Sequence, residues 1–239
     1  MLLYTTIYGK AINLFDDPDI NRAYVQNKVL FAKMMYPHLV NGINKFKDPT
    51  AITWLLVDRT APEGKTEVFE ASEVSDNSVT LSTQPLANSD YSVTVGGKYV
   101  YDYTVETGDD GVAKIVFGGS VVIGDTDEIS VEWYNAGQFN TDFAQASAPM
   151  ISAAVIADKT ADILARTLVL AWAEKNKNFL LEIRNILNNT DFNIYSPANS
   201  IKAKVDWVKD LQWDVDTMQT KLGWDLHSVS RRAGGYYGA

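Results

Sequence analysis

The sequence predicts an α+β fold, because helical and strand-like patterns occupy separate stretches of the chain. Apolar residues recur at helical spacing near the start of the chain and again from about residue 148. Between residues 65 and 134, apolar and polar side chains alternate instead, as they do in strands with one buried face. This order of element types favours segregated helices and strands over alternating βαβ units.

The same patterns predict three parts. Residues 1–60 and 140–228 are expected to form one discontinuous helical domain, with residues 65–135 inserted as an antiparallel β-sandwich. Residues 229–239 are expected to form a flexible C-terminal tail, because this stretch combines glycines with basic and aromatic side chains. With 239 residues, the chain is long enough to bury a substantial core.

A first helix is predicted to begin at Asp17 and Pro18. A carboxylate at this position can cap free backbone amides, and proline is tolerated in the first turn. Proline disfavours the helical conformation of the residue before it, so Pro37 is expected to end this helix about one residue earlier. The apolar positions of the predicted helix are Ile20, Tyr24, Phe31 and Met34 or Met35.

The middle of the chain predicts about six or seven short strands in a small antiparallel sandwich. Gly96 and Gly97 lie between two alternating runs, and paired glycines favour a two-residue hairpin turn with positive φ angles. The alternating positions are Val79 and Leu81; Tyr91, Val93 and Val95; Tyr99, Tyr101, Tyr103 and Val105; and Ile129, Val131 and Trp133.

Two long helices are predicted in the last third of the chain. The first runs from about Thr160 to Asn188, which corresponds to roughly 45 Å at 1.5 Å per residue. Its apolar stripe comprises Leu164, Leu168, Trp172, Phe179, Ile183 and Leu187. The second helix is expected to begin at Ser196 and Pro197 and to end at Gly223.

Composition excludes several classes of function. The absence of cysteine rules out disulfides and thiolate-bound metals. A net charge of −9 opposes a DNA-coating surface, although an acidic channel wall lets a duplex pass without binding it. No membrane segment is expected, because the most apolar stretch, Ile163 to Ala173, is far shorter than the roughly 20 residues that span a bilayer.

No catalytic constellation, cofactor site or metal site is predicted. The histidines, His38 and His227, belong to no ligand or triad spacing, and we interpret both as surface or capping residues. No nucleophile-elbow or phosphate-loop motif occurs in the sequence. Three groups of acidic residues could be proposed for calcium binding or paired-carboxylate chemistry. Each group adjoins a turn or the start of a helix, so we interpret these residues as helix caps and solvated turn residues. They are Asp16, Asp17 and Asp19; Asp109 and Asp110; and Asp125, Asp127 and Glu128.

The six tryptophans are expected mainly in the core, with some as candidates for partner binding. Trp133 and Trp172 follow the apolar patterns of their segments, which assigns them to the core. Trp207 and Trp213 are less clearly inward-facing, so they are candidate interface anchors.

Two stretches resemble proteins of tailed-phage virions. The first comprises SDYSVTVGGKYVYDYTV, AKIVFGG, GDTDEISVEWY and GQFNTDF, and is similar to a β-rich segment of such proteins. The second is LAWAEKNKNFLLEIRNILNNTDFNIYSPANSIKAKVDWV, which resembles the helical part of neck or ring proteins, particularly those of crAss-like gut phages. The resemblance implies a helical adaptor-like domain that carries the inserted sandwich.

This resemblance implies a head-to-tail adaptor rather than an enzyme. Copies of the chain would form a homo-oligomeric ring, commonly twelvefold, in the virion neck after assembly in the host cytoplasm. The ring would contact the portal protein and other neck or tail proteins, and DNA would pass through it transiently. Such adaptors often grip the portal with a C-terminal extension, which points here to Arg231, Arg232, Tyr236 and Tyr237.

Three other functions stay open. The β segment also suits another virion component, such as a tail, fibre-attachment or capsid-decoration protein. A carbohydrate-binding module would use exposed aromatic side chains of the insert. A hydrolase would require an essential Asp or Glu, and the sequence does not indicate which carboxylate would pair with it.

Overall fold

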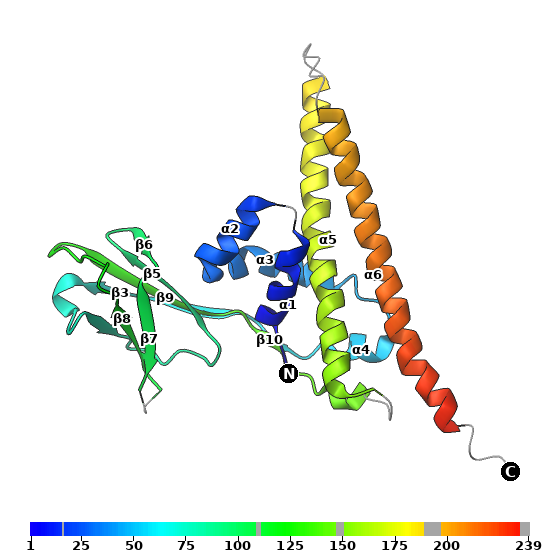
Figure 1. Ribbon diagram of the computed structural model, residues 1–239, viewed down its shortest axis with the longest axis horizontal. Coiled ribbons are helices and arrows are strands. Elements are labelled where there is room, and N and C mark those ends of the chain that lie inside the picture. Colours follow the sequence, from blue (N-terminus) through cyan, green and yellow to red (C-terminus); the bar gives the residue numbers. More distant parts are fainter. Residues whose placement is uncertain (16, 109–110, 147–150, 189–196, 235–239) are drawn as a thin grey trace. The chain divides into compact units, whose positions relative to one another are not determined.

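The computed structural model describes residues 1–15, 17–108, 111–146, 151–188 and 197–234, with backbone alone for residues 177–188, 197–201 and 227–234. Over these residues it contains six α-helices and three antiparallel sheets, about 51% helix and 24% strand, which confirms the predicted α+β fold (Figure 1). No helix in this part of the chain combines the length and apolarity needed to cross a membrane.

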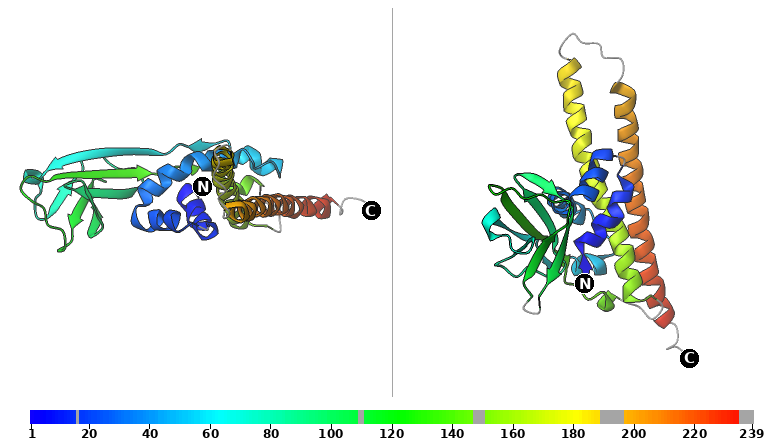
Figure 2. Two further views of the ribbon diagram at one scale, coloured as in Figure 1. Left: turned by 90° about the horizontal axis from the view of Figure 1, so that it is seen from above. Right: turned by 60° about the vertical axis from the view of Figure 1, so that its left-hand side comes forward.

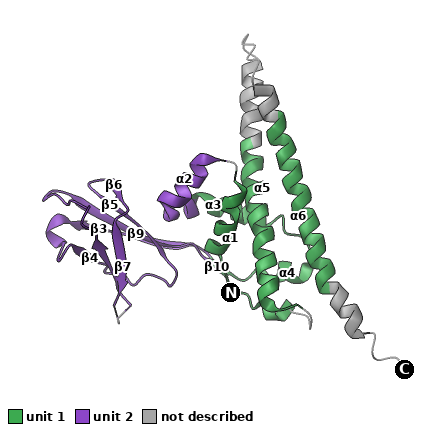
Figure 3. Ribbon diagram, viewed as in Figure 1, with its two compact units in different colours: residues 1–16, 34–60, 138–239 green, residues 17–33, 61–137 purple. Residues whose placement is uncertain are grey.

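The chain divides into two compact units, coloured separately in Figure 3. Unit 1 comprises residues 1–16, 34–60 and 138–239, and unit 2 comprises residues 17–33 and 61–137. Residues 17–33, which the sequence suggested as part of the helical domain, therefore group with the strands.

Unit 2 contains two antiparallel sheets that share one apolar core. The larger sheet has the order β3-β9-β5-β6 and the smaller one the order β4-β8-β7, which gives seven strands where six or seven were predicted. The strands are β3 (Glu63–Glu70), β4 (Ser78–Thr80), β5 (Asp90–Val95), β6 (Lys98–Val100), β7 (Tyr103–Thr107), β8 (Ala113–Phe117) and β9 (Glu128–Asn135), with a 3-10 turn at Ala71–Glu73. The core between them comprises Val79, Leu81, Val93, Val95, Ala113, Ile115, Phe117, Ile129, Val131 and Trp133.

The hairpin predicted at Gly96 and Gly97 is confirmed. Val95 pairs with Lys98, and the two glycines between them have φ angles of 55° and 74°. Two consecutive positive φ angles match a turn whose twist suits the flanking strands, and glycine adopts them without steric cost.

The tyrosine-rich run that follows does not form one strand. It changes sheets instead, because β6 pairs with β5 whereas β7 pairs with β8. Asp102 lies at the crossing, where its carbonyl accepts a hydrogen bond from the Gly118 amide at 2.8 Å. Its carboxylate accepts hydrogen bonds from the Ser120 amide and hydroxyl, which lower the pKa of Asp102. Alternation of side chains alone could not reveal this crossing, because both strands keep the same period.

The first predicted helix is two helices, α2 (Pro18–Gln26) and α3 (Lys28–Ile43). The start is confirmed, since the Asp17 side chain accepts a hydrogen bond from the Asp19 amide at 2.9 Å. The break falls at Asn27, whose backbone is extended and whose side chain accepts from the Leu30 amide at 2.9 Å.

The predicted end before Pro37 is wrong, because α3 continues through this proline. The proline ring is exposed, while Met35 and Leu39 on either side of it are buried in the core. Burial of such side chains stabilises by roughly 1.5–3 kcal/mol each, which offsets the roughly 3 kcal/mol cost of an internal proline.

Unit 1 is mainly helical. A small sheet of order β1-β10-β2 joins the N-terminus to the segment that leaves unit 2. The elements are β1 (Leu2–Leu3), α1 (Tyr4–Ala11), α4 (Thr50–Leu55), β2 (Arg59–Thr60), β10 (Gln138–Phe139), α5 (Ala153–Asn188) and α6 (Pro197–Gly234), with 3-10 turns at Ile12–Leu14 and Phe143–Ala146.

Helices α5 and α6 form a long antiparallel pair, seen side by side in Figures 1 and 2. The opposed directions follow from two contacts between them. Lys159 early in α5 forms an ion pair at 2.5 Å with Asp225 late in α6. Trp172 further along α5 packs edge-to-face on Trp207 near the start of α6, with ring centroids 6.4 Å apart.

Both predicted long helices are confirmed, but their bounds differ. Helix α5 begins at Ala153 rather than near Thr160, and Ser152 caps it by accepting hydrogen bonds from the Val155 and Ile156 amides. Helix α6 continues to Gly234, so the predicted stop at Gly223 is wrong. Leu222 beside this glycine is buried, and such burial offsets the roughly 1 kcal/mol cost of a glycine inside a helix. The segment predicted as a flexible tail is therefore helical over residues 229–234, and residues 235–239 lie outside the described part.

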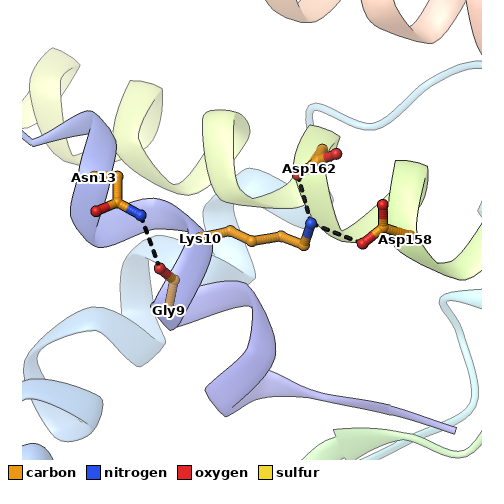
Figure 4. A network of polar contacts seen from close by, with 5 residues as sticks. All are labelled: Gly9, Lys10, Asn13, Asp158 and Asp162. Atoms are coloured by element: carbon orange, nitrogen blue, oxygen red, sulfur yellow. Dashed lines mark hydrogen bonds and ion pairs between the residues drawn. The ribbon is translucent and has the colours of Figure 1, made fainter.

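Lys10 joins α1 to α5 through two carboxylates on successive turns (Figure 4). Its ammonium lies 2.8 Å from the side chains of both Asp158 and Asp162, and these hydrogen bonds raise the pKa of Lys10. The helix spacing of four residues places both acids on one face of α5. Lys10 is therefore held as a cation between them.

Candidate interaction surface

The outer face of α6 carries two large exposed apolar side chains. The inner face packs on α5 and on residues 45–49, and it is marked by the buried residues Val208, Leu211, Val215, Gln219 and Leu222. At about 100° per residue, Trp213 and Trp224 fall within about 20° of each other and on the opposite side of the helix from that buried row. The two indoles are 68% and 74% exposed.

A shallow hollow separates the two tryptophans. It is lined by Trp213, Asp216, Thr217, Thr220, Lys221, Trp224 and Asp225. Asp216 accepts a hydrogen bond from Gln212 at 2.9 Å, and Thr220 donates back to the Asp216 carbonyl at 2.8 Å. The polar side chains between the rings thus hydrogen-bond within the helix, and the exposed indole rings form the apolar part of this surface.

The two rings lie far apart along the axis of α6. Eleven residues correspond to three helical turns, about 16 Å along the axis. Covering an aromatic ring of this size contributes of the order of 3 kcal/mol. Tryptophans ringed by polar groups are typical of the residues that dominate binding energy in protein interfaces. We call Trp213, Trp224 and the residues between them on this face the outer α6 surface.

The structure separates the sequence-predicted partner residues. Trp213 lies on the outer α6 surface, whereas Trp207 is half-buried against Trp172. Arg231 and Arg232 lie within the α6 backbone, and their side chains fall outside the described part of the chain. Tyr236 and Tyr237 lie outside it altogether.

Trp224 was missed as a partner-binding candidate, because the sequence suggested that α6 ended one residue before it. The useful signal was the eleven-residue spacing from Trp213, which keeps two residues on one helical face only when the helix is continuous. The core assignment of Trp133 agrees with its exposure of 3%.

The predicted position of His38 is wrong, because this side chain is buried. Burial lowers the pKa of His38, as does repulsion by Lys175, while a hydrogen bond to the backbone of Ala171 opposes both effects. His38 therefore lies in the packing of α3 on α5 as a neutral ring. His227 belongs to the α6 backbone, and its side chain is not in the described part.

Two of the acidic residues singled out in the sequence cap free amides, Asp17 at the start of α2 and Asp127 in a turn. Asp127 accepts a hydrogen bond from the Gly124 amide at 2.8 Å and closes a turn. Within the described residues, no group of three or more His, Cys, Asp or Glu side chains is arranged to hold a metal ion. Asp16, Asp109 and Asp110 lie outside that part of the chain.

Comparisons with known proteins add no relative. No protein-family model matches the chain, and no curated protein and no solved structure is similar to it. What the structure shows is an α+β protein with a long helical pair and two exposed tryptophans on the outer face of α6.

Proposed function

We propose that this chain is a structural virion protein that forms a ring in the neck of a tailed phage, between portal and tail. The observation that carries the proposal is the outer α6 surface, where Trp213 and Trp224 are exposed on the side opposite α5. Two such rings on one face of a long helix are costly in water and favourable in an interface.

Two features of the sequence support the neck in particular. The stretch at residues 170–208 resembles the helical part of phage ring proteins, and it includes the start of α6. The net charge of −9 suits a ring through which DNA passes, because like charge keeps phosphates from adhering to its wall. Portal contacts would use the C-terminal end, around Arg231 and Arg232.

Assembly is tested on the full-length protein by mass photometry and negative-stain electron microscopy. Wild-type protein is expected to form closed rings of one copy number. In the double variant, Trp213→Ala with Trp224→Ala, the dissociation constant of the ring is expected to rise at least tenfold, because both anchors are removed from the interface. Smaller species should therefore predominate. Tyr101→Ala, which removes a similarly exposed ring from unit 2, serves as the matched control and should leave the rings intact.

A monodisperse monomer at micromolar concentration, or unchanged rings in the double variant, would count against this surface as the assembly contact. The second candidate, another virion component such as a tail, fibre-attachment or capsid-decoration protein, is favoured by the aromatic side chains exposed on unit 2. Cryo-electron microscopy of particles that carry a labelled subunit distinguishes the two, because the neck proposal requires density at the portal vertex.

A further inference from the structure

A second candidate site lies within unit 2, where residues of α2, α3 and strands β5 to β7 line an open hollow of about 420 Å³. Small-molecule sites are typically 300–1,000 Å³, so this volume suffices for a ligand of one to a few rings. Four tyrosines contribute to the lining, namely Tyr91, Tyr99, Tyr101 and Tyr103. They come together because the chain changes sheets between β6 and β7.

The four tyrosines form a half-buried pair and an exposed pair. The hydroxyl of Tyr103 donates to the backbone carbonyl of Tyr91 at 2.8 Å, which ties β7 to β5 and fixes the Tyr103 ring; both rings are half-buried. Tyr99 and Tyr101 are 51% and 61% exposed. They also line the neighbouring hollow beside Asp102, so the exposed rings form a ridge between two depressions.

One acceptor in the hollow has no donor within the described part of the chain. Asp90 is half-buried there, and no hydrogen bond to its carboxylate is present among those residues. Burial raises the pKa of Asp90, whereas the nearby Lys28 ammonium lowers it. Among the described residues the Asp90 carboxylate is not a fully buried group left without a partner, so water reaches it. A hydroxyl group of a ligand can replace that water as the hydrogen-bond donor.

The charge of the lining indicates what kind of ligand fits. Asp90 and Lys28 carry opposite charges and leave the site formally neutral, and the other polar groups are the amides and hydroxyls of Gln26, Asn27, Ser89 and Ser92. An organic cation would be attracted by Asp90 and repelled by Lys28, and an anion the reverse, so the paired charges favour neither. The amides and hydroxyls around them suit a neutral ligand rich in hydroxyl groups.

We infer that this hollow binds a neutral carbohydrate. Tyr99 and Tyr101 offer flat apolar faces on which the C–H faces of sugar rings stack, and the Asp90 carboxylate accepts hydrogen bonds from sugar hydroxyls. The amides and hydroxyls around it supply further polar contacts. This binding is independent of the proposed ring, because every residue of the site belongs to unit 2 and none to the outer α6 surface.

The test begins with the full-length protein on a printed array of neutral and charged oligosaccharides. The neutral glycan with the strongest signal is then titrated by isothermal calorimetry. Saturable binding to wild-type protein is expected, with affinity lowered at least about tenfold by Tyr101→Ala and about fivefold or more by Asp90→Asn. Val68→Ala, which alters an exposed side chain on β3 away from the hollow, should change affinity less than twofold.

Three results would overturn the inference. They are no saturable binding of any neutral glycan, unchanged affinity in both Tyr101→Ala and Asp90→Asn, and binding confined to cationic or anionic probes. If Tyr101→Ala instead blocks incorporation into particles and leaves glycan affinity intact, the ridge contacts a protein and the inference fails. Because Trp213→Ala with Trp224→Ala should keep glycan binding, failure here and failure of the ring proposal are distinguishable.

Discussion

At the scale of single residues, His38 shows how a side chain acquires its setting from distant parts of the chain. Its immediate neighbours in sequence, Pro37 and Leu39, do not predict that His38 is buried. Burial is the main cause of its lowered pKa, and the two other groups that affect this pKa, Lys175 and the backbone of Ala171, belong to α5 and lie more than 130 positions further along the sequence. Such a setting depends on packing between helices, which local patterns do not encode.

The lowered pKa of His38 predicts a loss of stability on acidification. The ring is neutral when folded, and its pKa lies below the ordinary 6.5 that applies after unfolding, so the unfolded chain binds more protons. The contribution to stability is complete above about pH 6.5 and declines as pH falls towards the folded pKa. In urea unfolding, the free energy of unfolding of the wild type should therefore fall more steeply between pH 7 and pH 5 than that of His38→Gln. Parallel pH profiles for the two proteins would refute this role.

Glu67 is the second residue that predicts a measurable effect. This side chain on β3 is 8% exposed and accepts hydrogen bonds from the amides of Ser82 and Thr83 at 2.6 and 2.9 Å. Burial raises the pKa of Glu67, but these hydrogen bonds outweigh it and lower the pKa overall. Glu67→Gln should destabilise the protein by about 1–2 kcal/mol, because two charge-assisted bonds are weakened.

Thermal unfolding at pH 7 tests this expectation, with Glu106→Gln on β7 as the control. Glu106 is exposed, so its substitution should leave the unfolding midpoint almost unchanged. Equal midpoints for both variants would mean that the Glu67 contacts contribute little.

At the scale of elements, one glycine sets how closely α3 approaches α5. A Cβ placed on Gly42 would lie 2.9 Å from the Leu168 amide nitrogen and from two atoms of Thr167. Two of these three atoms are backbone, which cannot move aside without shifting the helix. Alanine normally stabilises a helix interior by about 1 kcal/mol relative to glycine, but Gly42→Ala should destabilise by about 1–3 kcal/mol.

The matched control is Gly119→Ala, since a Cβ at Gly119 has no atom within 4 Å. Urea unfolding should give a lower midpoint for the Gly42 variant and an almost unchanged midpoint for the Gly119 variant. An increase in stability for Gly42→Ala would show that the two helices separate easily.

The elements also show which parts of the fold were predictable. The helix cap at Asp17 and the turn at Gly96 and Gly97 were predicted correctly, because the residues that decide these features are adjacent in sequence. The helix ends predicted at Pro37 and Gly223 were wrong, because burial of neighbouring apolar side chains outweighs the unfavourable backbone preference of proline and glycine. The helix break occurred instead at Asn27, whose side chain caps the next helix.

At the scale of the whole molecule, the candidate sites were predictable in part. Trp213 was predicted as an interface anchor, but its companion Trp224 required a continuous α6. The tyrosines of unit 2 were predicted as strand residues, yet their convergence depends on the crossing at Asp102 between two sheets. The tyrosine hollow could not be derived from periodicity, because it depends on where separate segments meet. The outer α6 surface follows from an eleven-residue spacing, but only once α6 is known to continue past Gly223.

The discontinuity of unit 2 has a consequence for how the chain is made. Residues 17–33 leave the ribosome long before the strands they join, yet Asn27 donates to Ser92 on β5 at 3.1 Å and Lys33 pairs with Glu132 on β9. The early segment therefore lacks these partners until the 65 residues after Asn27 and the 99 residues after Lys33 have been synthesised. During translation its apolar side chains, including the buried Phe31, are open to other nascent chains and to chaperones.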